Sequence, residues 1–188
     1  MTRSPDTPIE RDADINNELL IAARYDSPDV IKQLIARGAN INSKNKYGDT
    51  ALIIAAEHKN PDILRLLIDE GADIDSRNNN GDTALIRATQ RSNPDTLRLL
   101  IDKGADIDIK NNNGLTALLM AEEGATKNYS VGVRDAYLLI RQLLRAAGEA
   151  RQQREAAAEE ARISYVSDPH LHRDMPRPKP LRFKGKTP

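Results

Sequence analysis

The chain has 188 residues and carries 28 Lys or Arg against 28 Asp or Glu, so its formal net charge is zero. A neutral chain has no bulk electrostatic field that steers it towards nucleic acid or membrane, so partner choice must be local. The absence of cysteine excludes a disulfide framework, a thiolate zinc site and a cysteine nucleophile. The charge is uneven, because residues 1–148 carry a net charge of minus three and residues 149–188 a net charge of plus three.

Residues 1–14 form a polar N-terminal segment without the hydrophobic core of an export signal. No apolar run in the chain approaches the roughly 20 residues that span a bilayer. We therefore expect a soluble, cytoplasmic protein with no transmembrane segment. Export is the alternative if a signal sequence has been removed.

The sequence repeats itself with a period of 33 residues. Gly48, Gly81 and Gly114 follow this spacing, and each opens the motif Gly-x-Thr-Ala-Leu-x-x-Ala. A second set of glycines has the same spacing and closes the motif Leu-Ile-x-x-Gly-Ala, at Gly38, Gly71 and Gly104. Self-similarity at a fixed period indicates a repeat architecture.

Each repeat predicts two short helices with recognisable ends. In the second repeat the first helix follows Thr50, a good capping residue, and places Leu52 and Ala55 on one face. The second helix begins with Asn60, a proline and an aspartate, and ends at Gly71. The Asn-rich runs between repeats predict turns. Because so short a helix pair cannot enclose its own apolar face, burial must be shared along a stack.

With this period and these motifs, the chain resembles the ankyrin-repeat family over residues 15–148. The repeats span residues 15–47, 48–80, 81–113 and 114–148. The resemblance implies an all-α solenoid of four stacked helix-turn-helix repeats, each with a hairpin-like finger, and a concave surface that binds protein. Members of the family are overwhelmingly adaptors and inhibitors rather than catalysts.

The chain departs from the family pattern at several positions. Alanine replaces the proline of the usual Thr-Pro-Leu-His, and Ile53, Ile86 and Leu119 replace its histidine, which predicts more purely apolar stacking. In the first repeat Asn17 replaces the threonine, and Gln33 stands where later repeats have leucine. Such polarity suits a terminal repeat that faces water.

The fourth repeat is longer than the others, because Gly148 lies 44 residues after Gly104. The eleven additional residues fall between its two helices, in the stretch 122–134. Insertions in repeat proteins map to loops on one face, which is often the binding face. A neutral elaboration of the surface is the alternative.

The C-terminal part has two sections. Residues 149–165 are strong helix formers with i, i+4 pairs such as Arg151 with Glu155, which predicts a charged extension of the last helix or a separate helix after Gly148. Residues 166–188 form a basic, proline-rich tail that we expect to be disordered. The tail could dock on the acidic body or reach a partner. Nucleic-acid binding is the less favoured use, because aromatic residues do not interleave with the basic ones.

The sequence contains no nucleophile elbow, phosphate loop or HExxH motif. His170 and His172 in the tail could hold a divalent metal, but a plain polar tail is the simpler interpretation. Asp73 and Asp75 resemble paired carboxylates, yet they recur with the 33-residue period, which marks them as turn residues. We therefore expect no catalytic residue, no metal site and no cofactor, and the chain is not predicted to be an enzyme.

The resemblance places recognition at the finger tips and along the exposed side of the first helices. Tyr25 and Tyr47 are the expected anchors, because tyrosine buries a large area with little loss of entropy. Carried onto this chain, the partner-binding residues are Arg24, Tyr25, Lys46, Tyr47, Asp49, Glu57, His58, Asn79, Asn80, Asp82, Gln90, Arg91, Asn112, Asn113, Leu115, Glu122 and Glu123.

These expectations define a protein-binding function. We expect a chain that is monomeric on its own and binds another protein through the concave face, the finger tips and the inserted loop. It would act as an adaptor, or as an inhibitor that neutralises its partner in the manner of an immunity protein. A tether to nucleic acid or to an anionic membrane through the basic tail is the alternative.

Overall fold

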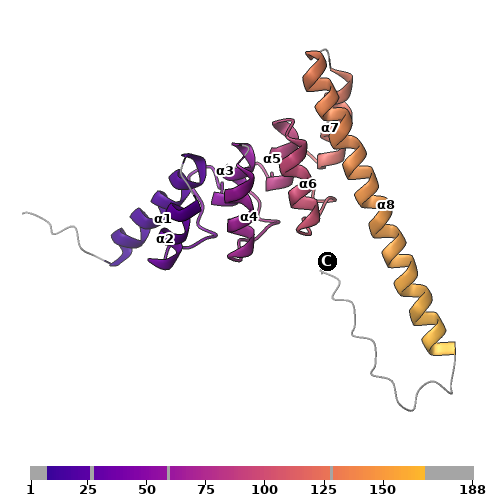
Figure 1. The fold of residues 1–188 in the computed structure, drawn as a ribbon, viewed down its shortest axis with the longest axis horizontal. Coiled ribbons are helices and arrows are strands. Elements are labelled where there is room, and N and C mark those ends of the chain that lie inside the picture. Colours follow the sequence, from indigo (N-terminus) through magenta and orange to yellow (C-terminus); the bar gives the residue numbers. More distant parts are fainter. Residues whose placement is uncertain (1–7, 26–27, 59, 128, 168–188) are drawn as a thin grey trace, which may run out of the picture. The chain divides into compact units, whose positions relative to one another are not determined.

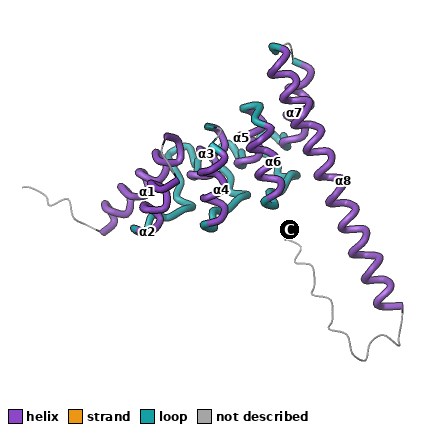
Figure 2. The backbone as a smooth tube through the Cα atoms, viewed as in Figure 1, coloured by secondary structure: helices purple, strands orange, loops and turns teal. Residues whose placement is uncertain are grey.

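The computed structural model describes residues 8–25, 28–58, 60–127 and 129–167, and these form eight helices without a strand (Figure 1). The helices are α1 (Pro8–Tyr25), α2 (Pro28–Ala36), α3 (Ala51–Glu57), α4 (Pro61–Asp69), α5 (Ala84–Gln90), α6 (Pro94–Asp102), α7 (Ala117–Thr126) and α8 (Val131–Ser167). Loops join them into helix-turn-helix units (Figure 2). The first helices α1, α3, α5 and α7 contact one another in chain order, as do α2, α4 and α6. The predicted all-α stack of helix pairs is confirmed.

The helix ends follow the predicted local signals. The Thr50 hydroxyl oxygen accepts a hydrogen bond from the Ile53 backbone N–H at 3.4 Å, and Thr83 and Thr116 cap α5 and α7 in the same way. The Asn60 side chain caps α4, just before the proline that begins it. Each cap satisfies a backbone donor that the first helical turn leaves unpaired. The glycines that follow α2, α4 and α6 have φ values of +97°, +91° and +88°, as left-handed helix caps require.

Apolar side chains from all the repeats form one core. Leu52 and Ile63 are almost completely buried. Ile53 and Ile86, which replace the family histidine, are each 1% exposed, so the predicted apolar stacking is confirmed at both positions. Leu119 is 45% exposed, and the same prediction is wrong there, because within the described residues no further repeat packs against α7.

α1 is longer than the first helices of the next two repeats. It has 18 residues and begins at Pro8, whereas α3 and α5 have seven residues each. The helix therefore extends into the segment before residue 15 that the sequence assigns to a polar N-terminal stretch. In the first repeat Ile15 replaces the finger glycine and Asn17 replaces the threonine cap, so no local signal stops the helix there.

The eleven inserted residues mainly lengthen the helices of the fourth repeat. α7 has ten residues where α3 and α5 have seven, and α8 begins seven residues before the position equivalent to the start of α6. Only residues 127–130 lie between α7 and α8. The predicted loop is therefore wrong over most of the stretch 122–134. Glu122, Glu123 and Ala125 are good helix formers, which favours the extension of α7.

Gly124 allows α7 and α8 to approach closely. A Cβ atom at this glycine would lie 2.7 Å from Cγ of the Tyr137 ring. Tyr137 is 8% exposed, and its hydroxyl donates a hydrogen bond to the Gln90 carbonyl oxygen at 3.4 Å. Ile140 and Leu144 of α8 are also buried, so the beginning of α8 belongs to the same core.

α8 passes through Gly148 without a break, so the last helix is extended rather than followed by a separate helix. The chain divides into one compact unit that ends at Gly148 and a second unit that begins at Glu149. Within the second unit the Arg151 Nε donates to Glu155 Oε1 at 3.0 Å, which is the predicted i, i+4 pair.

Candidate functional site

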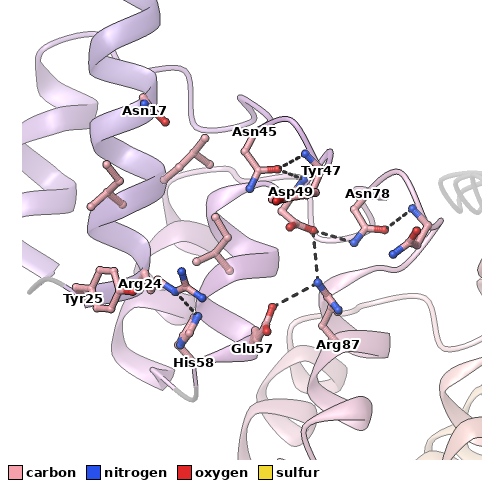
Figure 3. A pocket seen from close by; sticks show the side chains of 14 residues that line it. Asn17, Arg24, Tyr25, Asn45, Tyr47, Asp49, Glu57, His58, Asn78 and Arg87 are labelled. Atoms are coloured by element: carbon pink, nitrogen blue, oxygen red, sulfur yellow. Dashed lines mark hydrogen bonds and ion pairs between the residues drawn. The ribbon is translucent and has the colours of Figure 1, made fainter.

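A groove with a volume of ≈ 450 Å³ lies along α1, α3 and α5 and the first two fingers, defined here as residues 39–49 and 72–82 (Figure 3). Figure 3 places Tyr25, at the end of α1, and Tyr47, in the first finger, on opposite sides of the view. Of the predicted partner-binding residues, those that line the groove are Arg24, Tyr25, Tyr47, Asp49, Glu57, His58 and Asn80. Those that lie outside it are Lys46, Asn79, Asp82, Gln90, Arg91, Asn112, Asn113, Leu115, Glu122 and Glu123.

Asp49 and Asp82 are predicted as exposed recognition residues, but the structure buries both. They are 7% and 3% exposed. The Asn78 side-chain amide donates to Asp49 Oδ1 at 2.8 Å, and the Asn111 amide donates to Asp82 Oδ1 at 2.9 Å. A buried carboxylate needs such partners, because burial without hydrogen bonds is unfavourable. Each aspartate therefore links its own finger to the next one, and the expectation that its side chain is exposed is wrong.

Backbone hydrogen bonds also join consecutive fingers. The Asn79 backbone N–H donates to the Tyr47 carbonyl oxygen at 3.0 Å, and the Asn112 N–H donates to the Asn80 carbonyl oxygen at 2.9 Å. The Asn79 side-chain amide donates to the Lys46 carbonyl oxygen at 3.0 Å. The Asn79 side-chain amide and the Tyr47 carbonyl oxygen therefore take part in hydrogen bonds that join the first two fingers.

Two finger glycines are required by this close approach. Gly48 and Gly81 have φ values of +77° and +76°, which disfavour any residue with a Cβ atom. A Cβ at Gly48 would lie 2.7 Å from the Asn79 backbone nitrogen, and one at Gly81 would lie 2.8 Å from the Asn112 backbone nitrogen. The glycines therefore serve both the turn and the contact between fingers.

Arg87 of α5 is a groove residue that sequence reasoning missed. Its Nη2 lies 3.4 Å from Glu57 Oε2 and 3.9 Å from Asp49 Oδ1, and its side chain is 22% exposed. Dashed lines in Figure 3 mark both ion pairs. Arg91, at the end of α5, forms a second ion pair with Glu57. Arg87 stands where the 33-residue period has Ile54 in the preceding repeat. A charge in place of an apolar residue was the signal that could have identified it.

The two expected anchor tyrosines present most of their rings to solvent. Tyr25 is 72% exposed and Tyr47 is 60% exposed. Cζ of Arg24 lies 5.4 Å from the centroid of the Tyr25 ring, and the Arg24 Nε donates to His58 Nε2 at 2.7 Å. Nζ of Lys46 lies 5.0 Å from the centroid of the Tyr47 ring. Each tyrosine therefore carries a cation on its face, at a distance typical of cation–π contacts.

Two titratable groups of the groove have shifted pKa values. Burial raises the pKa of Glu57, but the hydrogen bond from Arg91 and the charges of Arg87, Arg91 and His58 outweigh it, so the pKa lies below its usual value. Burial and the charge of Arg24 lower the pKa of His58, and the opposing charge of Glu57 does not compensate. Glu57 is therefore ionised and His58 neutral near pH 7. A neutral His58 agrees with its role as the acceptor for Arg24.

The two glutamates of the fourth repeat are already in ion pairs. Glu122 Oε1 lies 2.5 Å from Arg145 Nη2 of α8, and Glu123 Oε1 lies 3.5 Å from Lys127 Nζ. Their side chains are 36% and 57% exposed. Exposed ion pairs of this kind contribute little stability, so both carboxylates can exchange their partners.

Within the described residues no three His, Cys, Asp or Glu side chains gather in a way that could hold a metal ion. His170 and His172, the candidate ligands, lie outside the described residues, as does the basic tail considered as a tether. Within the same ranges, none of the helices combines the length and the apolarity needed to span a bilayer.

Comparison with known proteins identifies the class. Residues 19–111, which include the whole groove except Asn17, match a family model described as ankyrin repeats in three copies. The comparison with curated proteins gives no match. The matched segment holds the helix pairs α1–α2, α3–α4 and α5–α6 with linked fingers, so the chain is an ankyrin-repeat protein. Ankyrin repeats are protein–protein interaction modules, so the general class of function is the binding of other proteins.

Proposed function

We propose that the chain is a non-catalytic module that holds a partner protein in its groove, either as an adaptor or as an inhibitor that neutralises the partner. The observation that carries the proposal is the pair of exposed tyrosines, Tyr25 of α1 and Tyr47 of the first finger, which line the same groove of ≈ 450 Å³. Tyrosine is enriched among the residues that dominate binding energy at protein interfaces, because it offers a large apolar area and one polar atom.

The charged groups at the base of the groove are paired within the chain. Asp49 accepts from Asn78, and Glu57 is held by Arg87 and Arg91. A partner would meet side chains that lose little further freedom on binding, which favours affinity. The hydrogen bonds between the fingers also favour affinity, because they fix the backbone conformation at Tyr47.

The chemistry of the groove also supports binding rather than catalysis. His58 is the histidine of the groove, and its Nε2 already accepts a hydrogen bond from Arg24. The carboxylates Asp49 and Glu57 are each paired with a cation, and the pKa of Glu57 is lowered rather than raised. General-base catalysis near pH 7 requires a group whose pKa lies close to that pH, which the lowered pKa of Glu57 does not offer.

Site-specific photo-crosslinking of the full chain in its source cells tests the proposal. A photoreactive amino acid placed at Tyr25 or at Tyr47 should capture the same partner protein. The matched control carries it at Arg65, which is exposed on α4 away from the groove, and should not capture that protein. Equal capture from Arg65, or no protein captured from either tyrosine position, would contradict the proposal.

A further probe position defines how far the contact extends. Tyr129 lies between α7 and α8, is 44% exposed and stacks on Tyr137 with ring centroids 5.8 Å apart. Capture of the same partner from Tyr129 would add the lengthened helices of the fourth repeat to the binding surface. Capture from Tyr25 and Tyr47 alone would confine binding to the groove.

A further inference from the structure

Two cations beside the groove contact no carboxylate among the described residues. Arg24 donates to neutral His58 and lies over the Tyr25 ring. Lys46 lies over the Tyr47 ring. Both cations are exposed, and both sit at the rings that the proposed function treats as anchors.

The other cations around the groove differ, because they are already neutralised. Arg87 lies within ion-pair distance of Asp49 and Glu57, and Arg91 pairs with Glu57. The base of the groove is therefore balanced in charge, while the cation at each tyrosine ring has no carboxylate partner within the described residues. Complementary charge on a partner would be attracted to those two positions.

Apolar surface belongs to the same groove. Ile21 of α1 lines it and is 54% exposed, and Ile54 of α3 lines it and is half-buried. An exposed isoleucine on a recessed surface gains most from an apolar side chain that covers it. The groove thus combines an apolar patch with two cation-bearing aromatic rings.

We propose that the groove takes an acidic segment of the partner protein, in which carboxylates contact Arg24 and Lys46 and an apolar side chain covers Ile21 and Ile54. This inference rests on the proposed function and names the chemistry of its partner. The carboxylates would extend each cation–tyrosine pair, since a cation held on a ring keeps its outer face open to a second, anionic partner.

The same surface is less suited to the phosphate backbone of a nucleic acid. Affinity for a phosphate chain depends on several available cations along its path, whereas Arg87 and Arg91 are already paired with carboxylates. A phosphate backbone also brings no apolar side chain to Ile21. An acidic peptide can bring carboxylates to the two cations and an apolar side chain to Ile21 and Ile54.

Fluorescence anisotropy of the full chain with short labelled peptides tests the inference. The acidic probe has glutamates on both sides of a central phenylalanine, and matched probes replace the glutamates by glutamines or the phenylalanine by alanine. A single-stranded DNA oligonucleotide is the competing probe. The acidic probe should bind at least about tenfold more tightly than either matched peptide, and its affinity should fall with salt, since the contacts are exposed.

Charge-reversal variants locate the binding. The double variant Arg24→Glu with Lys46→Glu should weaken binding of the acidic probe by about tenfold or more. The matched control, Arg65→Glu with Arg98→Glu, changes the net charge equally at exposed positions on α4 and α6 and should stay within about twofold of the unmodified chain. If the reversal lowers the melting temperature, the milder pair Arg24→Gln with Lys46→Gln takes its place.

Each remaining outcome overturns the inference. The glutamine probe binding as tightly as the acidic one would show that the carboxylates do not matter. Equal losses in the two double variants would assign the effect to net charge, and DNA binding more tightly than the peptides would favour a nucleic acid. If no peptide binds while the photo-crosslinks at Tyr25 and Tyr47 still capture a protein, the proposed function stands and the acidic segment is wrong.

Discussion

The second and third repeats have a neighbour on both sides, whereas the fourth has one only on the side of the third, within the described residues. Ile53 and Ile86 are buried between repeats, but Leu119, at the same place in the motif, is 45% exposed. When the fourth repeat is aligned on its closing glycine, Arg141 of α8 falls where α6 has the buried Leu97. The same motif therefore contributes differently to the stability of the fold, depending on whether a further repeat packs against it.

The interfaces between these repeats also differ in the polar interactions that cross them. Ion pairs from Glu57 to Arg87 and Arg91 join the second repeat to the third. The third and fourth repeats meet through hydrogen bonds, such as that from the Tyr137 hydroxyl to the Gln90 carbonyl oxygen. The Glu57–Arg87 ion pair lies in the groove, so the interface between the second and third repeats is part of the surface that the proposed function assigns to the partner.

The largest expected difference is in the core. Leu64→Ala removes a completely buried side chain between interior repeats and should lower the free energy of unfolding by about 2–5 kcal/mol. Leu119→Ala removes a side chain that is 45% exposed and should cost about 1 kcal/mol or less. Urea denaturation followed by circular dichroism measures both. Equal losses would mean that the fourth repeat is covered as fully as the second.

The finger glycines give the next largest contrast. Gly81→Ala and Gly114→Ala both force a Cβ onto a left-handed backbone, at about 1–2 kcal/mol each. At Gly81 the new atom would also meet the Asn112 backbone nitrogen, while at Gly114 it meets nothing within 4 Å. Overpacking should therefore make Gly81→Ala worse by about 1–3 kcal/mol. Indistinguishable melting temperatures for the two variants would argue against contact between the fingers.

A smaller contrast distinguishes two helical glycines of the fourth repeat. Gly124→Ala places a Cβ against the Tyr137 ring, so a clash of about 1–3 kcal/mol should exceed the gain in helix propensity. Gly148→Ala meets only Ile107 Cδ1 at 3.8 Å and should stabilise the chain by about 0.5–1 kcal/mol. Differential scanning calorimetry should show shifts of opposite sign. Stabilisation by both substitutions would rule out tight packing of α7 on α8.

The smallest expected effect is on the pH dependence of stability that arises from the ion pairs between the second and third repeats. The folded-state pKa of Glu57 is lowered, so its stabilising contribution is complete above the usual carboxyl pKa of about 4.3 and is lost as the pH falls through the folded value. His58 acts in the same direction, because its folded-state pKa is also lowered and stability declines below about pH 6.5. Melting temperature against pH should therefore be flatter on the acid side for Glu57→Gln than for the unmodified chain. Parallel curves would contradict the ion-pair account.

Local features of the fold were predictable from the sequence, because the residues that determine them lie within a few positions of one another. Thr50 and Asn60 cap their helices as expected, and the glycines after the second helices adopt left-handed conformations. Non-local features were not predictable. The burial of Asp49 depends on Asn78 of the next finger, and that pairing has no signature in either finger alone.

The groove was predictable in part. Tyr25 and Tyr47 were identified because the family resemblance points to helix ends and finger tips, and both prove to be exposed. Arg87 was missed because the prediction followed the shared motif, whereas this residue departs from it. The helical form of the insertion was missed because α8 begins with a Val-Gly-Val run of low helix propensity, and its first turns depend on non-local packing such as that of Tyr137 against Gly124.

Hydrogen–deuterium exchange of the chain with and without its crosslink-identified partner tests the central claim most directly. If the partner lies in the groove, the backbone around Tyr25, the first finger and the C-terminal end of α3 should gain protection, while α4 and α6 remain unchanged. Protection confined to α4, α6 or the second half of α8, with none in the groove, would contradict the account.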